Sequence, residues 1–184
     1  GLRMQATALQ MARVAAAIGE GRVPTPSLLA ALDDRPARST STITLPMPLD
    51  RVRAGMKAVI ETGTARNAFA SPAFSDVRAG LYGKTGTAPV PGIYSRNSAW
   101  FVGYLEPDTL AGESRRLAFA VFVGRSELTG GAHAAAVMAA LIESLLHRAK
   151  STPDCLGPVE RQAFSACVPH GPAGAEQTRW LVAR

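Results

Sequence analysis

The sequence contains no apolar run that approaches the ~18 residues of a membrane-spanning helix. It also lacks the charged, apolar and small-residue regions of a secretory signal peptide at its start. We therefore expect no membrane span within this chain. Because the first residues already read as the approach to a helix, we expect the chain to be a piece of a longer protein.

Aromatic residues are scarce, at 6% of the chain, and the basic residues are scattered. The net charge of +6 comes from 20 Lys and Arg against 14 Asp and Glu, in ones and twos as in DRVRAG and ESRRLA. Nucleic-acid binding favours a dense basic stripe with aromatic residues between the charges. The sequence therefore predicts no nucleic-acid partner, although an unrelated basic interaction module remains one alternative.

Groups that bind metals or cofactors are equally few. The chain has three histidines, His133, His147 and His170, and their spacing to one another and to the two cysteines matches no metal site. We expect no metal and no cofactor, and the spacing assigns these histidines no role.

Hydrophobic periodicity predicts one α+β domain of helices and an antiparallel sheet. The expected strands at 99–105 and 117–124 are apolar on both faces, which places them centrally in a sheet covered on both sides. Connections are too short for parallel crossovers, so we expect a meander with the last helix packed across it. The expected helices are 7–18, stopped by Gly19, then 49–62 and 132–150; the expected strands are 81–87, 99–105 and 117–124.

Composition changes after Ser151, where proline, glycine and cysteine become frequent. We expect residues 1–150 to form the folded part and residues 151–184 to form a C-terminal tail outside the core.

The stretch GLYGKTGTA, residues 80–88, carries Lys84 in an otherwise uncharged strand. A nucleotide phosphate loop is excluded, because its leading glycine falls at Arg78 and its required helix is prevented by Gly86, Pro89 and Pro91. Taken alone, a lysine here reads as an edge-strand charge that prevents aggregation.

Lys84-Thr85-Gly86 also matches one of three motifs of the active-site serine acyltransferases, which include penicillin-binding proteins and β-lactamases. The lysine provides a positive field for a substrate carboxylate and for deprotonating a nearby hydroxyl. Thr85 and Thr87 offer hydroxyl donors to that carboxylate, and Gly86 lets a substrate backbone lie along the strand edge. We expect the amine and hydroxyls to line one open cleft, with no acid neutralising the lysine.

The similarity extends over roughly residues 1–149, which resemble the second half of a penicillin-binding protein transpeptidase domain. The resemblance implies an antiparallel sheet sandwiched by helices, with the Lys-Thr-Gly strand beside the nucleophile. It implies D,D-transpeptidase activity on peptidoglycan stem peptides through an acyl-enzyme that β-lactams mimic. The successive blocks are ATALQMARVAAAIGEGRVPTPSLL, VRAGMKAVIETGTAR, LYGKTGTA, AWFVGYLEP, LAFAVFV and GGAHAAAVM.

Two of the family's motifs are missing. No serine stands three residues before a lysine: those positions hold Ala54, Leu81 and His147. The only S-x-N match, Ser95–Asn97, follows the Lys-Thr-Gly strand, where we expect a turn. Both motifs are therefore expected before Gly1, and the chain alone is predicted to be inactive. Of the oxyanion hole, the resemblance leaves only the backbone N–H of Thr87 here.

The resemblance further implies an extracytoplasmic, periplasmic location, with the parent protein anchored to the inner membrane. In that compartment disulfides persist, so we favour a Cys155–Cys167 bridge, worth about 3 kcal/mol in the chain-entropy model. The implied partners are stem peptides, β-lactams and the missing N-terminal half. A non-catalytic remnant that binds wall peptides or a partner chain stays open as an alternative.

Overall fold

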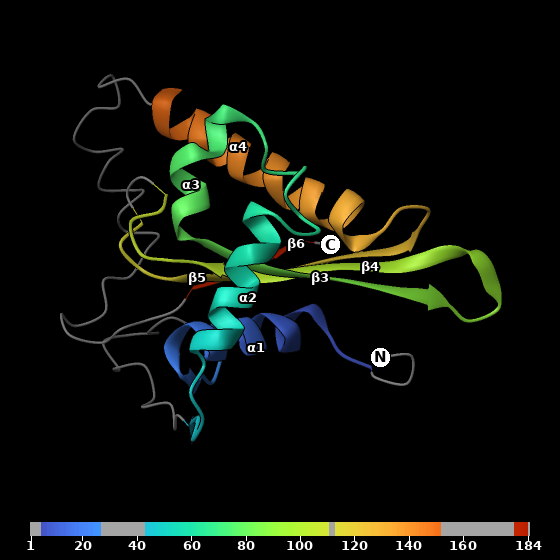
Figure 1. Cartoon of the computed structure of the whole chain (residues 1–184), viewed down its shortest axis with the longest axis horizontal. Coiled ribbons are helices and arrows are strands. Elements are labelled where there is room, and N and C mark those ends of the chain that lie inside the picture. Colours follow the sequence, from blue (N-terminus) through green and yellow to red (C-terminus); the bar gives the residue numbers. More distant parts are fainter. Residues whose placement is uncertain (1–4, 27–42, 111–112, 152–178, 184) are drawn as a thin grey trace, which may run out of the picture.

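The computed structural model describes residues 5–26, 43–110, 113–151 and 179–183. One sheet separates α4 and α3 on one face from α1 on the other, and α2 stands beside the sheet (Figure 1). The helices are α1 (Ala8–Glu20), α2 (Asp50–Glu61), η1 (Pro72–Phe74), α3 (Ser75–Gly80), η2 (Gly130–Ala134) and α4 (Ala135–Ser151). The strands are β1 (Arg22–Val23), β2 (Ile43–Thr44), β3 (Leu81–Val90), β4 (Ile93–Leu105), β5 (Leu117–Ser126) and β6 (Arg179–Ala183).

The main sheet has the order β3-β4-β5-β6, and β1 pairs separately with β2. The first two pairings of the main sheet are antiparallel, which confirms the expected meander, and they bring Lys84 opposite Val102. β6 adds a fourth strand, parallel to β5, from the segment that the sequence analysis assigned to a tail.

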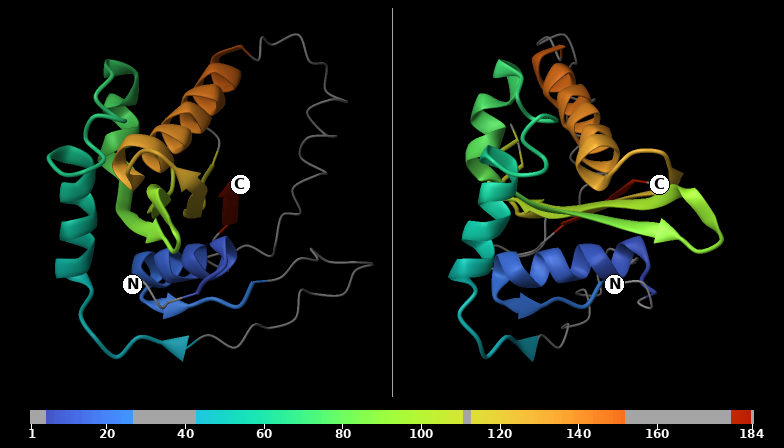
Figure 2. Two further views of the ribbon diagram at one scale, coloured as in Figure 1. Left: turned by 90° about the vertical axis from the view of Figure 1, so that its right-hand side faces the viewer. Right: turned by 45° about the vertical axis from the view of Figure 1, so that its right-hand side comes forward.

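Both faces of the sheet are covered, as the apolar central strands require. On one face Phe101 and Phe119 pack with Met138 and Ile142 of α4 in the larger core cluster. On the other face a smaller cluster joins Ala16 of α1, Met56 of α2, Tyr104 and Ala118. Figure 2 shows the resulting layers, with α4 above the sheet and α1 below it. The α+β class is confirmed.

α1 begins as the sequence predicts but ends later. Thr7 forms a capping box with Gln10, in which each side chain bonds the other residue's backbone N–H. The expected stop at Gly19 is wrong, because the helix continues to Glu20 and is capped by Gly21, which takes the left-handed conformation with φ 75°. Gly19 is instead buried in the helix, where a Cβ would lie 2.7 Å from Arg116 Cδ.

The β3–β4 hairpin corrects a second expectation. β3 runs on to Val90 and β4 starts at Ile93, so the turn is only two residues long, Pro91 and Gly92. Ser95–Asn97 therefore lies within β4 rather than in a turn before it. Pro89 is tolerated because β3 is an edge strand.

α2 connects the elements on either side of the edge strand. Arg53 donates from Nε to the carbonyl of Ile18 at 2.9 Å and from Nη2 to that of Gly19 at 3.2 Å. Lys57 donates to the carbonyls of Arg78 and Ala79 at the end of α3. Two side chains of one helix thus satisfy terminal carbonyls of two others.

Candidate functional site

The Lys-Thr-Gly segment lies in the middle of β3, at the edge of the sheet. Lys84 through Thr87 pair in unbroken antiparallel register with residues 99–102 of β4. Because successive side chains of a strand point to opposite faces, Lys84 shares a face with Val102, and Thr85 and Thr87 point to the face of α4. Within the described ranges, no strand pairs with the outer edge of β3.

Lys84 is exposed, and its side chain folds back so that the ammonium contacts the backbone of β3. Nζ donates a hydrogen bond to the carbonyl of Thr85 at 2.7 Å. Among residues that the structure describes, no carboxylate lies within ion-pair distance of it. The positive charge is therefore not neutralised by this part of the chain. The expected arrangement of the amine beside the threonine hydroxyls is not found, because Lys84 and the two threonines project from opposite faces of β3 and the amine bonds a carbonyl.

The two threonine hydroxyls bond to groups from other segments. Thr85 Oγ1 lies 2.6 Å from Oγ1 of Thr64, in the turn after α2. Thr87 Oγ1 accepts from the backbone N–H of Gly130 at 2.9 Å. Neither Thr64 nor Gly130 was predicted from the sequence, where the only local signals are a small hydroxyl residue in ETGT and a glycine pair before the last helix.

Gly86 sits between these threonines with its α-carbon against the neighbouring strand. A Cβ there would lie 3.3 Å from Cβ of Trp100, which is tight but not forbidden. The ring of Trp100 contacts that of Phe122 in a tilted arrangement, with centroids 4.5 Å apart, while Phe101 and Tyr104 are fully buried. These aromatic residues pack within the sheet and its core.

The S-x-N match does not meet the Lys-Thr-Gly segment. Asn97 pairs with Pro89, five positions along the hairpin from the Lys84–Val102 pair. At the strand rise this separation is about 17 Å. Ser95–Asn97 is therefore not placed to act with Lys84.

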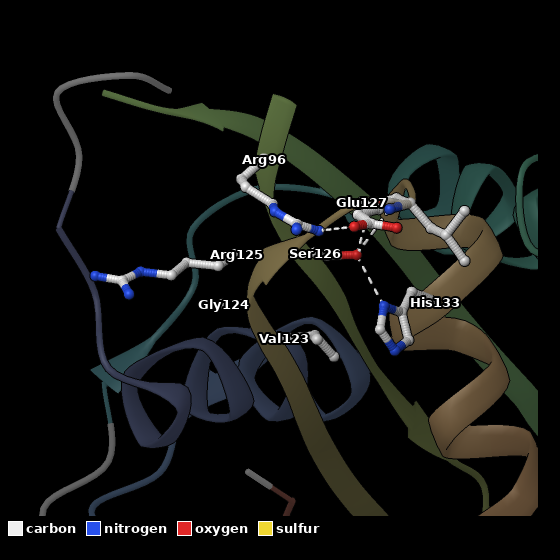
Figure 3. A pocket seen from close by; sticks show the side chains of 8 residues that line it. Arg96, Val123, Gly124, Arg125, Ser126, Glu127 and His133 are labelled. Carbon is white, nitrogen blue, oxygen red and sulfur yellow. Dashed lines mark hydrogen bonds and ion pairs between the residues drawn. The ribbon is translucent and has the colours of Figure 1, made fainter. Parts of the chain in front are cut away.

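A pocket of about 250 Å³ lies at the end of β5, lined by Arg96, Ser126, Glu127 and His133 among others (Figure 3). Its polar groups bond one another: Arg96 pairs with Glu127, and buried Ser126 Oγ lies 2.8 Å from Nδ1 of His133. Ser126 also bonds both the N–H and the carbonyl of Leu128. These contacts fasten the turn from β5 to α4, which gives His133 a structural partner that spacing did not reveal.

The remaining expectations concern metals, membrane and cysteines. In the described ranges, no group of three or more His, Cys, Asp and Glu side chains is arranged to hold a metal ion. No helix there has the length and apolar character needed to cross a bilayer. Cys155 and Cys167 lie outside the described residues.

The family model for the penicillin binding protein transpeptidase domain matches residues 1–143. This match spans most of the chain, including all of α1, α2 and strands β3 to β5. The chain belongs to the penicillin-binding protein transpeptidase family. A search among curated proteins finds no match.

Membership in the transpeptidase family supports a penicillin-binding, transpeptidase-like function connected with the cell wall. It also suggests binding of peptidoglycan and β-lactams, and transpeptidase domains of this family are typically extracytoplasmic. The matched region contains the Lys84–Thr87 segment, and it ends before the 151–184 segment.

Proposed function

We propose that this chain is the C-terminal part of a serine D,D-transpeptidase domain that cross-links peptidoglycan stem peptides, and that it supplies one wall of the active site. The observation that carries the proposal is the edge strand β3, where consecutive positions offer two threonine hydroxyls and an ammonium that pairs with no carboxylate of the described residues. Family membership gives this arrangement its context.

The proposed chemistry assigns a role to each residue of the segment. Lys84 is the catalytic cation: it attracts the substrate carboxylate and favours loss of the proton from a nearby hydroxyl. Thr85 and Thr87 donate hydrogen bonds to that carboxylate, and Gly86 admits a substrate backbone along the strand edge. The backbone N–H of Thr87 serves as one donor of the oxyanion hole, where developing negative charge needs a preorganised partner.

The nucleophile belongs to a different part of the protein in this proposal. Acyl transfer needs an activated serine, and no S-x-x-K stands in these 184 residues. We place S-x-x-K and S-x-N upstream of Gly1. The chain alone is then unable to form an acyl-enzyme.

The sheet face around Lys84 is suited to receive that upstream half. Trp100, Val102 and Phe122 share this face by register, are only half-buried, and belong to neither core cluster. A half-covered apolar strip beside an unneutralised cation is what an incomplete active site presents.

The same proposal covers the outlying parts of the chain. Residues 1–150 form the C-terminal part of the transpeptidase domain, and residues 151–184 follow as a segment that returns to its sheet through β6 and carries a Cys155–Cys167 disulfide. The parent protein acts in the periplasm and is anchored to the inner membrane. This part of the proposal is supported by the typically extracytoplasmic location of the family's domains and by the persistence of disulfides outside the cytoplasm.

Labelled penicillin tests the proposal on the full-length protein and on this chain alone. We expect one stoichiometric adduct on the full-length protein, mapped by peptide analysis to a serine of S-x-x-K before Gly1. The isolated chain is expected to form no adduct. A full-length protein without any adduct that still binds stem peptide would instead identify a non-catalytic remnant, and an adduct on a serine within residues 1–184 would overturn the assignment.

A further inference from the structure

The hydroxyls of Thr85 and Thr87 are each contacted from outside the sheet, by segments to which no function has yet been assigned. Thr64 lies 21 positions before Thr85, and Gly130 lies 43 positions after Thr87. Both contacts fall on the face of β3 that looks toward α4. Two separate parts of the chain thus converge on the two side chains proposed to recognise a carboxylate.

The partner of the Thr87 hydroxyl, the backbone N–H of Gly130, decides whether that hydroxyl donates or accepts. A threonine hydroxyl has one hydrogen to donate and two lone pairs to accept with. The N–H of Gly130 can only donate, so the oxygen of Thr87 accepts in this bond and keeps its own hydrogen. Thr87 is exposed, and its hydroxyl makes no other hydrogen bond with the described residues. The hydroxyl hydrogen of Thr87 therefore remains available to an incoming acceptor.

The Thr85 hydroxyl likewise accepts a hydrogen bond and keeps its own hydrogen available when the Thr64 hydroxyl is the donor. The two oxygens are 2.6 Å apart and either hydroxyl can be the donor. With Thr64 as donor, the hydrogen of Thr85 points to an anion, and the two bonds in series polarise one another. With Thr85 as donor, an anion would meet only lone pairs there. An approaching carboxylate therefore selects the arrangement in which Thr64 donates.

Backbone contacts, rather than flexible side chains, hold Gly130 and Thr64 in place. A Cβ on Gly130 would lie 2.3 Å from the carbonyl oxygen of Gly86 and 2.5 Å from that of Trp100. A Cβ on Gly131 would lie 2.1 Å from the carbonyl oxygen of Thr64. The glycine pair is thus wedged between β3 and the turn that carries Thr64, at a spacing that no side chain permits.

We propose that the Thr64 hydroxyl and the Gly130 N–H are positioning groups for carboxylate recognition. They hold Thr85 and Thr87 as outward hydrogen-bond donors, ready for the carboxylate of a stem peptide or a β-lactam. This inference rests on the proposed function. It adds to it a residue and a backbone group that act through the threonines without touching the ligand.

Acylation of the full-length protein by labelled penicillin tests Thr64. Thr64→Val keeps the shape and removes the hydroxyl, and we expect acylation at low penicillin concentration to slow about 5- to 10-fold, on the scale of one hydrogen bond. Thr64→Ser should restore it to within about twofold. Thr62→Val is the matched control, because Thr62 bonds only the carbonyl of Ala58 and is expected to react like wild type.

A ligand without the carboxylate separates positioning from general structural damage. With the methyl ester of the same penicillin, Thr64→Val and wild type should react at equal, lower rates. An equal loss with acid and ester would show that Thr64 only supports the fold, and no loss with either would also overturn the inference. Failure of the wild type to react at all would reject the proposed function itself.

Amide hydrogen exchange at Gly130 tests the second group without any chemistry. In Thr87→Val the N–H loses its acceptor and should exchange faster, whereas in Thr87→Ser it should exchange as in wild type. Unchanged exchange in Thr87→Val would contradict the proposed bond.

Discussion

Tyr104 carries a fully buried hydroxyl that has no hydrogen-bond partner among the described residues. Its ring stacks on Tyr82 at 4.8 Å, and the guanidinium of Arg116 lies over the ring, 5.7 Å from its centroid. Burial raises the pKa of Tyr104 well above its ordinary value near 10, and the carboxylate of Glu106 adds to the shift. The ring is thus well placed, while its hydroxyl is a cost to the fold.

Tyr104→Phe is therefore expected to stabilise the chain by about 1 kcal/mol, because it removes a buried polar group that bonds nothing. The raised pKa of Tyr104 also fixes the direction in which stability changes with pH. The native tyrosine keeps its proton when the unfolded one loses it, so the native state binds more protons and stability falls as pH rises above about 10. Urea denaturation at pH 7 and pH 10.5 should show a higher midpoint for the variant and a smaller alkaline loss. Tyr82→Phe, on the stacked but half-buried partner, is the control and should change neither.

At the scale of elements, α2 fastens its neighbours through long basic side chains. α1 has no basic residue in its own last turn, and Arg53 of α2 reaches the carbonyls of Ile18 and Gly19 there. Lys57 does the same for α3, and burial among these groups lowers its pKa although Glu61 opposes the shift. The helix that leads to Thr64 is in this way tied to both sides of the sheet.

Arg53→Met keeps much of the apolar stem but removes both hydrogen bonds to the end of α1. We expect a loss of about 1–2 kcal/mol, the scale of charge-assisted bonds to helix-terminal carbonyls. Arg51→Met serves as the matched control, since Arg51 is exposed on the same helix and is expected to shift the urea midpoint little. Equal shifts in the two variants would show that Arg53 does not hold α1.

For the elements, sequence patterns predicted the types correctly and some of the ends incorrectly. Residues 99–105 and 117–124 are apolar on both faces, and they are central strands because both sheet faces are covered. The glycine at position 19 was misjudged, since close packing against Arg116, and not helix termination, explains it. β6 was missed because a strand that pairs with β5 from 62 positions away, as Arg179 does with Leu117, leaves no local signal.

At the scale of the whole molecule, the proposed function makes the chain the Lys-Thr-Gly wall of a site whose nucleophile lies outside these 184 residues. The motif at 84–86 was readable from sequence because its residue types and spacing are local. The proposed roles of Thr64 and Gly130 were not readable in this way, because the bonds that they form join segments 21 and 43 positions apart. The separation of amine and hydroxyls to opposite faces likewise follows from the pleat of β3 and not from the letters of the motif.

The most direct test of the central claim is the rate at which the full-length protein is acylated by penicillin when Lys84 is replaced. Lys84→Ala should slow acylation by about 10²-fold or more, as expected for a positioned electrostatic or acid–base group. Arg51→Ala, which removes an exposed charge on α2, should leave the rate unchanged, and Thr85→Val should slow it less than Lys84→Ala because Thr87 remains. If Lys84→Ala reacted as fast as wild type, β3 would be sheet structure only and the proposed active-site wall would be wrong.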